Sequence, residues 1–246
     1  MSLRSESVNG VLRLTLDAPE KRNAIDIAMR DALRDALADV AEGAVLLRGE
    51  GDHFCAGIDL SASPAPGIDV VDRMRTSTQD LVRSIRRCRA PVVVAVQGTC
   101  AGIALGLVAA ADVSIAAFDA RFDASFLKRG LVLDGGLAHA LVHTVGLVRA
   151  RSLALGPAWS ANEAVVAGLV TASVPGDELL QEATRRAEEL AGRPKHAVTL
   201  AKDLLNAAAD ADFETVLLVE RAAQGVLTTT PEFAAGSARF LARDDR

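Results

Sequence analysis

The stretch that most limits the possible folds is an all-apolar run, PVVVAVQ at residues 91–97, followed at once by the glycine-spaced segment GTCAGIALGLVAAAD at residues 98–112. A short run without alternating polar residues is typical of a strand that helices cover on both faces, as in a parallel sheet. The apolar segment after it predicts a helix. Together they predict a strand–turn–helix unit inside an α/β protein.

The same alternation of strand and helix extends over most of the chain. VLRLTLD at residues 11–17 alternates apolar and polar side chains, whereas IDIAMRDALRDALADVA at residues 25–41 has apolar residues at helical spacing. From about residue 178 only helical patterns follow. We therefore predict an α/β core at residues 1–177 and a helical C-terminal region at residues 178–246. The loop SASPAPGID at residues 61–69 is of the kind that can move over a site.

Composition and charge exclude several classes of function. The formal net charge is -5 and aromatic residues make up only 3% of the chain, so no nucleic-acid partner is expected. The apolar run at residues 101–118 is at the short limit for a membrane span and contains Asp112, so a buried helix and a strand are predicted there. The N-terminal MSLRSESVNG lacks a signal-peptide core, and the three cysteines are widely spaced, which predicts a cytoplasmic protein.

Histidines and cysteines give little sign of a site. No HExxH pattern is present, and we predict no metal site. His139 and His143, at helical i,i+4 spacing, are interpreted as surface or interface side chains. His53 is interpreted as a turn residue, and Cys55 and Cys100 as small packing residues without a neighbouring base.

Two segments share the order strand, glycine turn, helix: VLLRGEGDHFCAGIDL at residues 45–60 and VVVAVQGTCAGIALG at residues 92–106. Neither carries the G-x-G-x-x-G or GK[ST] pattern of nucleotide-binding turns. A helix N-terminus leaves backbone N–H groups unpaired, and two converging groups of this kind would form an oxyanion hole. Alternatively, the glycines serve only tight packing of strand on helix. The residues alone leave both interpretations open.

At these residues the chain resembles the crotonase superfamily, the enoyl-CoA hydratases and isomerases. The matching segments, in the family's order, are APEKRNAID (18–26), GDHFCAGIDL (51–60), PVVVAVQGTCAGIALGLVAAADVSIA (91–116), GLVLDGG (130–136), WSANEAVVAGLVTASVP (159–175) and TPEFAAGSARFLA (230–242). The resemblance covers essentially the whole chain. It implies a spiral of ββα units with a C-terminal trimerisation region, a homotrimer or dimer of trimers, a CoA thioester as ligand, and no metal or redox cofactor.

The resemblance also implies site residues, position by position. The backbone N–H groups of Ile58 and Ile103 are implied to form the oxyanion hole. The residues implied to contact the CoA or its acyl group are Arg22, Ala24, Ala56, Gly57, Asp59, Leu60, Ser61, Gly102, Phe126, Leu133 and Lys202. Lys202 is implied to lie near a CoA phosphate, and its alternative interpretation is a solvated charge on a helix face.

The sequence departs from the hydratase pattern at two positions. Hydratases of this family carry two glutamates that position a water molecule, and the corresponding residues here are Gly106 and Phe126. Neither side chain can accept or donate a proton, so hydration by the two-glutamate mechanism is expected to fail.

One acidic residue remains at a position that relatives use for proton transfer or nucleophilic attack. Asp134 in GLVLDGG corresponds to that aspartate, and its neighbours Leu131, Val132 and Leu133 are expected to desolvate it and raise its basicity. Alternatively, Asp134 caps the helix that begins at GGLAHALV. The two roles are compatible.

Three functions follow as hypotheses. The favoured one is an enzyme that shifts the double bond of an enoyl-CoA, with Asp134 carrying a proton between carbons. An enoyl-CoA hydratase of the fatty acid β-oxidation type is the enzymatic alternative. A non-catalytic acyl-CoA-binding protein on the same fold is the alternative from another class, and the loss of both glutamates favours it.

Overall fold

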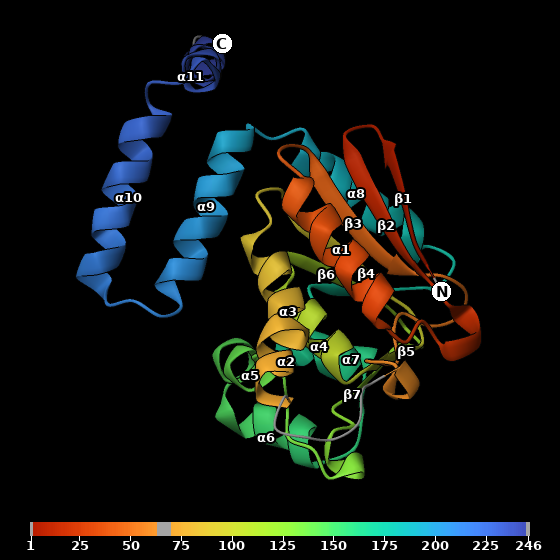
Figure 1. Cartoon of the computed structure of the whole chain (residues 1–246). Coiled ribbons are helices and arrows are strands. Elements are labelled where there is room, and N and C mark those ends of the chain that lie inside the picture. Colours follow the sequence, from red (N-terminus) through yellow and green to blue (C-terminus); the bar gives the residue numbers. More distant parts are fainter. Residues whose placement is uncertain (1, 63–69, 245–246) are drawn as a thin grey trace. The chain divides into compact units, whose positions relative to one another are not determined.

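The computed structural model describes residues 2–62 and 70–244 (Figure 1). Most of the loop predicted at residues 61–69 lies outside the described residues. The chain divides into two compact units, Met1–Ala191 and Gly192–Arg246. Among the described residues, no helix is both long and apolar enough to cross a bilayer.

The first unit is built on a six-stranded sheet in which the first strand is antiparallel and the others are parallel. Its order is β1 (Ser2–Val8), β2 (Val11–Asp17), β3 (Ala44–Gly49), β4 (Val92–Val96), β6 (Val113–Ala117), β9 (Ala172–Val174). The predicted strands at residues 11–17 and 91–97 are confirmed. The sequence analysis missed β1, which joins β2 through Asn9 and Gly10, both at positive φ as a two-residue hairpin turn requires.

A second sheet has three strands, and the first of them lies where the sequence pattern predicted that a helix begins directly. It consists of β5 (Thr99–Ala101), β7 (Arg121–Asp123) and β8 (Trp159–Ser160). β5 is parallel to β7, and β8 is antiparallel to it. The second glycine turn therefore contains a short strand before its helix.

The helices of the first unit are α1 (Ile27–Asp39), α2 (Val70–Thr76), α3 (Thr78–Arg87), α4 (Ile103–Ala110), α5 (Leu137–Val145), α6 (Leu147–Leu155), α7 (Ala161–Ala167) and α8 (Leu179–Ala191), with 3-10 turns η1 (Pro19–Lys21), η2 (Leu60–Ala62) and η3 (Leu127–Arg129). The second unit holds α9 (Lys195–Ala208), α10 (Phe213–Leu227) and α11 (Pro231–Asp244). Ser77 separates α2 from α3, and Gly146 separates α5 from α6.

Alternate side chains of the large sheet feed two separate cores. Leu14, Leu47 and Val94 face the cluster that includes α1, α3 and α4. The opposite face, which includes Leu46 and Val93, packs against Leu179, Ala183 and Ala187 of α8. Figure 1 shows α1 and α8 on opposite sides of the strands. The helix that was predicted to open the C-terminal region is thus part of the first unit, whose boundary lies at residues 191 and 192.

Candidate active site

The two glycine turns lie side by side. Cys55 and Cys100 form an isolated parallel bridge, in which the Cys55 N–H donates to Thr99 O (3.0 Å) and the Ala101 N–H donates to Cys55 O (2.9 Å). Gly57 and Gly102 follow at positive φ (101° and 59°) and face each other. A Cβ on Gly57 would lie 3.1 Å from Ala101 O, closer than side chains normally approach a backbone oxygen. Glycine therefore allows the two turns to meet.

Each turn leaves a backbone donor free. In its bridge with Ile25, the segment around Ile58 uses Gly57 O and the Asp59 N–H, so the Ile58 N–H faces the other side. Ile103 is the first residue of α4, where N–H groups have no partner inside the helix. Within the described part of the chain, neither the Ile58 nor the Ile103 N–H donates to another protein group. This pair of donors is what an oxyanion hole needs, and the assignment itself stays a prediction.

Asn23 anchors the first turn, and the sequence analysis did not single it out. It is fully buried, its Oδ1 accepts the Ala18 N–H (2.9 Å), and its Nδ2 donates to Glu50 O (2.8 Å) and His53 O (2.6 Å). Its φ of 56° is one that asparagine tolerates better than most residues. The signal for Asn23 was the N-A pair in APEKRNAID. In that segment only Arg22 and Ala24, on either side of Asn23, were assigned a role.

Asp59 holds the end of the first turn. Its carboxylate accepts from Lys21 Nζ (2.6 Å) and from the Ser61 hydroxyl (2.6 Å), and these two bonds lower the pKa of Asp59 to about 2. Leu60 beside it is exposed. Of the residues implied to contact CoA here, Asp59 and Ser61 are thus bonded to each other, and their contact with a ligand stays a prediction.

Asp134 directly precedes Gly135, which lies against Ile103 at the start of α4. Burial raises the pKa of Asp134 from 3.8 to about 6, and among the described residues its Oδ1 is buried without a hydrogen-bond partner. The alternative that its side chain caps α5 is wrong. Gly136 is the N-cap residue without a side-chain bond, and the Leu137 N–H donates to the backbone oxygen of Asp134.

The surroundings of Asp134 differ in part from the expectation. Leu131 and Val132 are exposed, and only Leu133 packs partly against the core. The next residue, Gly135, is buried at a positive φ of 58°. A Cβ there would collide with Ile103 Cδ1 and lie 3.0 Å from Val82 Cγ2. The backbone next to Asp134 is therefore fixed against Ile103 and Val82 by a tight glycine contact, and Leu131 and Val132 do not cover it.

Val82 and Ile103 also fill the space beside Gly106. A Cβ on Gly106 would lie 3.2 Å from Val82 Cγ2 and 3.6 Å from Ile103 Cδ1. Phe126, at the other position where hydratases carry a glutamate, is buried in the apolar core. Apolar groups thus surround both positions that lack a carboxylate.

A cavity of about 370 Å³ adjoins the two turns and is lined by Ala56 and Ala101, two residues before Ile58 and Ile103. Arg22 also lines it, and Arg22 O accepts the Ala56 N–H (2.9 Å). Ala24, two residues after Arg22, is half-buried. The structure thus brings two residues of the implied CoA site, Arg22 and Ala56, to one cavity. Lys202 lies on α9 of the second unit, and its contact with CoA stays a prediction.

The contacts of His53, Cys55 and Cys100 indicate structural roles for these three candidates. His53 Nδ1 accepts the Thr99 N–H (3.2 Å) and so links the two turns. Burial raises the pKa of the Cys55 thiol to about 12 and also raises the pKa of Cys100, so neither thiol is a nucleophile near neutral pH.

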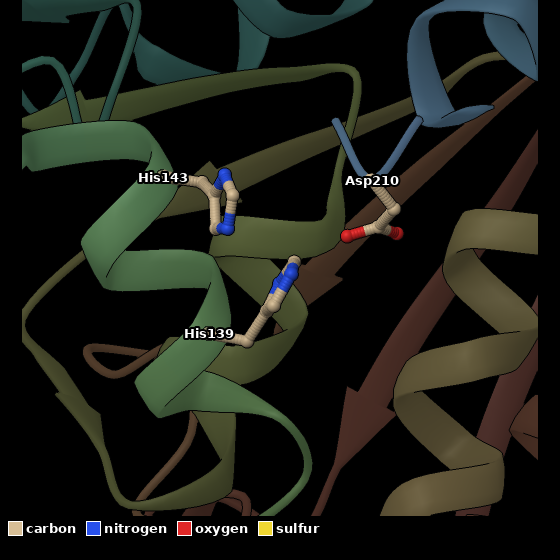
Figure 2. Close-up of side chains that lie close together, drawn as sticks. All are labelled: His139, His143 and Asp210. Atoms are coloured by element: carbon tan, nitrogen blue, oxygen red, sulfur yellow. The ribbon is translucent and has the colours of Figure 1, made fainter. Parts of the chain in front are cut away.

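His139 and His143 lie one turn apart on the exposed side of α5, with stacked rings whose centroids are 4.2 Å apart (Figure 2). Asp210, also labelled in Figure 2, belongs to the second unit. Within the first unit the histidines form a pair, which is fewer side chains than a structural metal site uses.

The chain is similar to known proteins over nearly its whole length. A family model described as Enoyl-CoA hydratase/isomerase matches residues 6–245. The chain is 35% identical over 243 residues to a probable enoyl-CoA hydratase of Rhodobacter capsulatus, with 98% of this chain and 95% of that protein covered. It is 33% identical over 246 residues to the 1,2-epoxyphenylacetyl-CoA isomerase of Escherichia coli, with 95% and 93% covered. A solved structure of an enoyl-CoA hydratase from Polaromonas sp. JS666 matches with a TM-score of 0.91 at 31% identity, with 99% and 98% covered.

Proposed function

Because the chain belongs to the enoyl-CoA hydratase/isomerase family, we propose that it shifts a carbon–carbon double bond in an enoyl-CoA through an enolate intermediate. The match to solved structures confirms the crotonase-type fold predicted from the sequence. The observation that carries the proposal is Asp134, a half-buried carboxylate whose Oδ1 is buried without a hydrogen-bond partner in the described chain, and whose neighbour Gly135 packs against Ile103. It is the acid/base group that remains where the two hydratase carboxylates are missing.

The proposed reaction moves one proton. The Asp134 carboxylate removes a proton from a carbon next to the double bond, and the C–H electron pair passes into the conjugated system, leaving negative charge on the thioester oxygen. The Ile58 and Ile103 N–H groups hold that oxygen. The protonated Asp134 then returns the proton to the other end of the system, and the electron pair forms the new C–H bond, so that substrate and product have the same composition.

The pKa of Asp134 suits this role. A group with a pKa of about 6 is mainly ionised at neutral pH, yet it is a stronger base than an ordinary aspartate. The two N–H groups would supply the electrostatic stabilisation, since one such donor typically contributes about 3 kcal/mol to the transition state. No metal or redox group takes part in these steps.

Hydration is the weaker enzymatic alternative. It requires a positioned water molecule, and the side chains that hold it in hydratases are replaced by Gly106 and Phe126 in apolar surroundings. Relatives of this chain include a probable enoyl-CoA hydratase of Rhodobacter capsulatus and the 1,2-epoxyphenylacetyl-CoA isomerase of Escherichia coli, so both hydratases and isomerases are among them. The missing carboxylates favour isomerisation over hydration.

A direct test supplies 3-enoyl-CoA and 2-enoyl-CoA esters of several chain lengths and measures their interconversion and their hydration. We expect isomerisation that Asp134→Asn abolishes and that Asp119→Asn, a change at an exposed turn, leaves intact. Hydration at a rate similar to isomerisation would contradict the proposal.

The lack of both glutamates also favours a second candidate, a protein that binds acyl-CoA without turnover. Exchange of substrate protons with D2O separates the two, because an active Asp134 exchanges them even where the equilibrium conceals net conversion. Tight binding of acyl-CoA without exchange on any ester would establish the binding protein instead.

A further inference from the structure

More cationic than anionic side chains line the cavity beside the two turns. Three cationic side chains line it, Arg22, Lys128 and Arg129, against one carboxylate, Asp123. The chain as a whole has a net charge of -5, so this is a local excess of cations in an acidic protein. Lys128 and Arg129 were given no role by the sequence analysis.

The cations differ in how firmly they are held. Lys128 Nζ pairs with Asp123 Oδ2 (2.7 Å). Arg129 Nη1 donates to the hydroxyl of Ser125 (3.0 Å), and Ser125 is itself buried. The guanidinium of Arg22 has no hydrogen-bond or ion-pair partner in the part of the chain that the structure describes. One carboxylate therefore balances one of the three charges.

The backbone of Arg22 is anchored to the first turn. Arg22 has a left-handed φ of 51°, and its carbonyl oxygen accepts the Ala56 N–H. Ala56 precedes the proposed oxyanion donor Ile58 by two residues, and Ala101 on the same cavity precedes Ile103 by two. The three cations thus line the same cavity as Ala56 and Ala101, which precede the two proposed oxyanion donors.

We propose that Arg22, Lys128 and Arg129 form an anion subsite next to the oxyanion turns, which binds a phosphate group of CoA or a carboxylate at the far end of the acyl group. The identity of the ligand in this proposal rests on the proposed function. The binding of an anion at these three cations does not depend on it. Guanidinium and ammonium groups are the usual partners of both kinds of anion.

The first experiment uses pyrophosphate alone as the probe, in isothermal titration of the intact protein at low salt. We expect the wild type to bind it, and Arg22→Gln, Lys128→Gln and Arg129→Gln to weaken binding by about threefold each, as for exposed ion pairs. Arg121→Gln, a cation on β7 that does not line the cavity, is the matched control and should bind as the wild type does. Melting temperatures show that each variant is folded. An equal loss in the control, or no loss in the three variants, overturns the subsite.

The second experiment separates the two sources of the anion. Binding of CoA, dephospho-CoA and pantetheine is compared in the wild type and in a Lys128→Gln/Arg129→Gln double variant, as is binding of butanoyl-pantetheine and succinyl-pantetheine. Weakening confined to the CoA compounds assigns the subsite to a phosphate, and weakening confined to the succinyl ester assigns it to a carboxylate. Equal weakening of butanoyl-pantetheine and pantetheine, which carry no anion, contradicts the proposal.

Failure of the proposed function has a different signature. If the wild type binds pyrophosphate in the predicted manner but no CoA ester, the anion subsite stands and the acyl-CoA function falls. If it converts enoyl-CoA while all the cation variants bind pyrophosphate and CoA normally, the function stands and the subsite falls.

Discussion

A single side chain, Asp134, links the stability of the fold to its proposed chemistry. Its carboxylate is half-buried, its Oδ1 is buried without a hydrogen-bond partner among the described residues, and its pKa is about 6 instead of 3.8. The folded protein therefore binds more protons than the unfolded chain between about pH 4 and pH 6. The contribution of Asp134 to the free energy of unfolding is therefore largest below about pH 4. It falls as the pH rises to about 6.

Asp134→Asn should consequently make the protein more stable and less active. At pH 7 we expect a gain of about 1–3 kcal/mol, because the charged group is removed from a desolvated position and each pKa unit corresponds to about 1.4 kcal/mol. At pH 4 the gain should vanish. Isomerisation should fall by about 10² to 10⁴, the range for loss of a general base. Urea unfolding at both pH values and steady-state kinetics measure these effects, and unchanged stability with lost activity would show that burial does not set this pKa.

The same carboxylate predicts the pH dependence of the reaction. kcat/KM for isomerisation should rise about tenfold per pH unit below pH 6 and level off above it, because the ionised form of Asp134 is the base in the free enzyme. Initial rates from pH 4.5 to 8 test this. A midpoint near the ordinary aspartate value of 3.8 would assign the base to another group.

Gly106 is a position where restoring a lost carboxylate should be costly. A Cβ there meets Val82 Cγ2 at 3.2 Å, so Gly106→Glu overpacks the contact between α3 and α4 and should cost about 1–3 kcal/mol. Val82→Ala in the Gly106→Glu background should recover part of this loss, whereas Val82→Ala in the wild type should destabilise. A double-mutant cycle on unfolding free energies measures the coupling, and additive effects would mean that Val82 does not oppose the larger side chain.

Among the elements, the two glycine turns depend on one backbone contact. Gly57 lies at φ 101° with Ala101 O close by, so Gly57→Ala must shift the turn that presents the Ile58 N–H. We expect kcat to fall by about 10²-fold or more, as for the loss of one oxyanion donor, with a smaller change in the affinity for CoA. Gly130→Ala, at a positive φ in open space, is the control for backbone strain alone. Similar losses of activity in both variants would contradict a special role for Gly57.

The sequence predicted elements better than it predicted their joints. PVVVAVQ and VLRLTLD formed the expected strands because their apolar periodicity matches the faces they bury. β5 was missed because a strand of three residues has no periodicity of its own. Asn23 was missed for a related reason, since its partners Glu50 and His53 lie far away in the sequence. The resemblance supplied the positions of Ile58, Ile103 and Asp134, but contacts such as Gly135 with Ile103 require the folded chain.

At the scale of the molecule, both buried cores are complete within the first unit. Among the described residues, neither cluster contains one beyond Ala191, and α8 supplies Leu179, Ala183 and Ala187 to the second cluster. The periodicity of residues 178–192 indicated an amphipathic helix but not its partner, so α8 was grouped with the helices that follow it. The apolar side of α8 covers one face of the large sheet. This face is as apolar as the opposite face, which packs against α1, α3 and α4. The role of the later helices in oligomerisation stays a prediction.

Two truncated chains test where the folding unit ends. A chain of residues 1–191 should fold and melt cooperatively, because it retains both cores. A chain of residues 1–177 lacks α8 and exposes Val11, Leu46, Val93 and Ile115, and each such side chain contributes about 1.5–3 kcal/mol when buried. The sum is comparable to the entire net stability of a domain, so the shorter chain should be unfolded or aggregated. Circular dichroism, thermal melting and light scattering distinguish the two. Cooperative folding of residues 1–177 would show that α8 is an accessory to the sheet, whereas aggregation of residues 1–191 would show that the first unit needs the helices beyond Ala191.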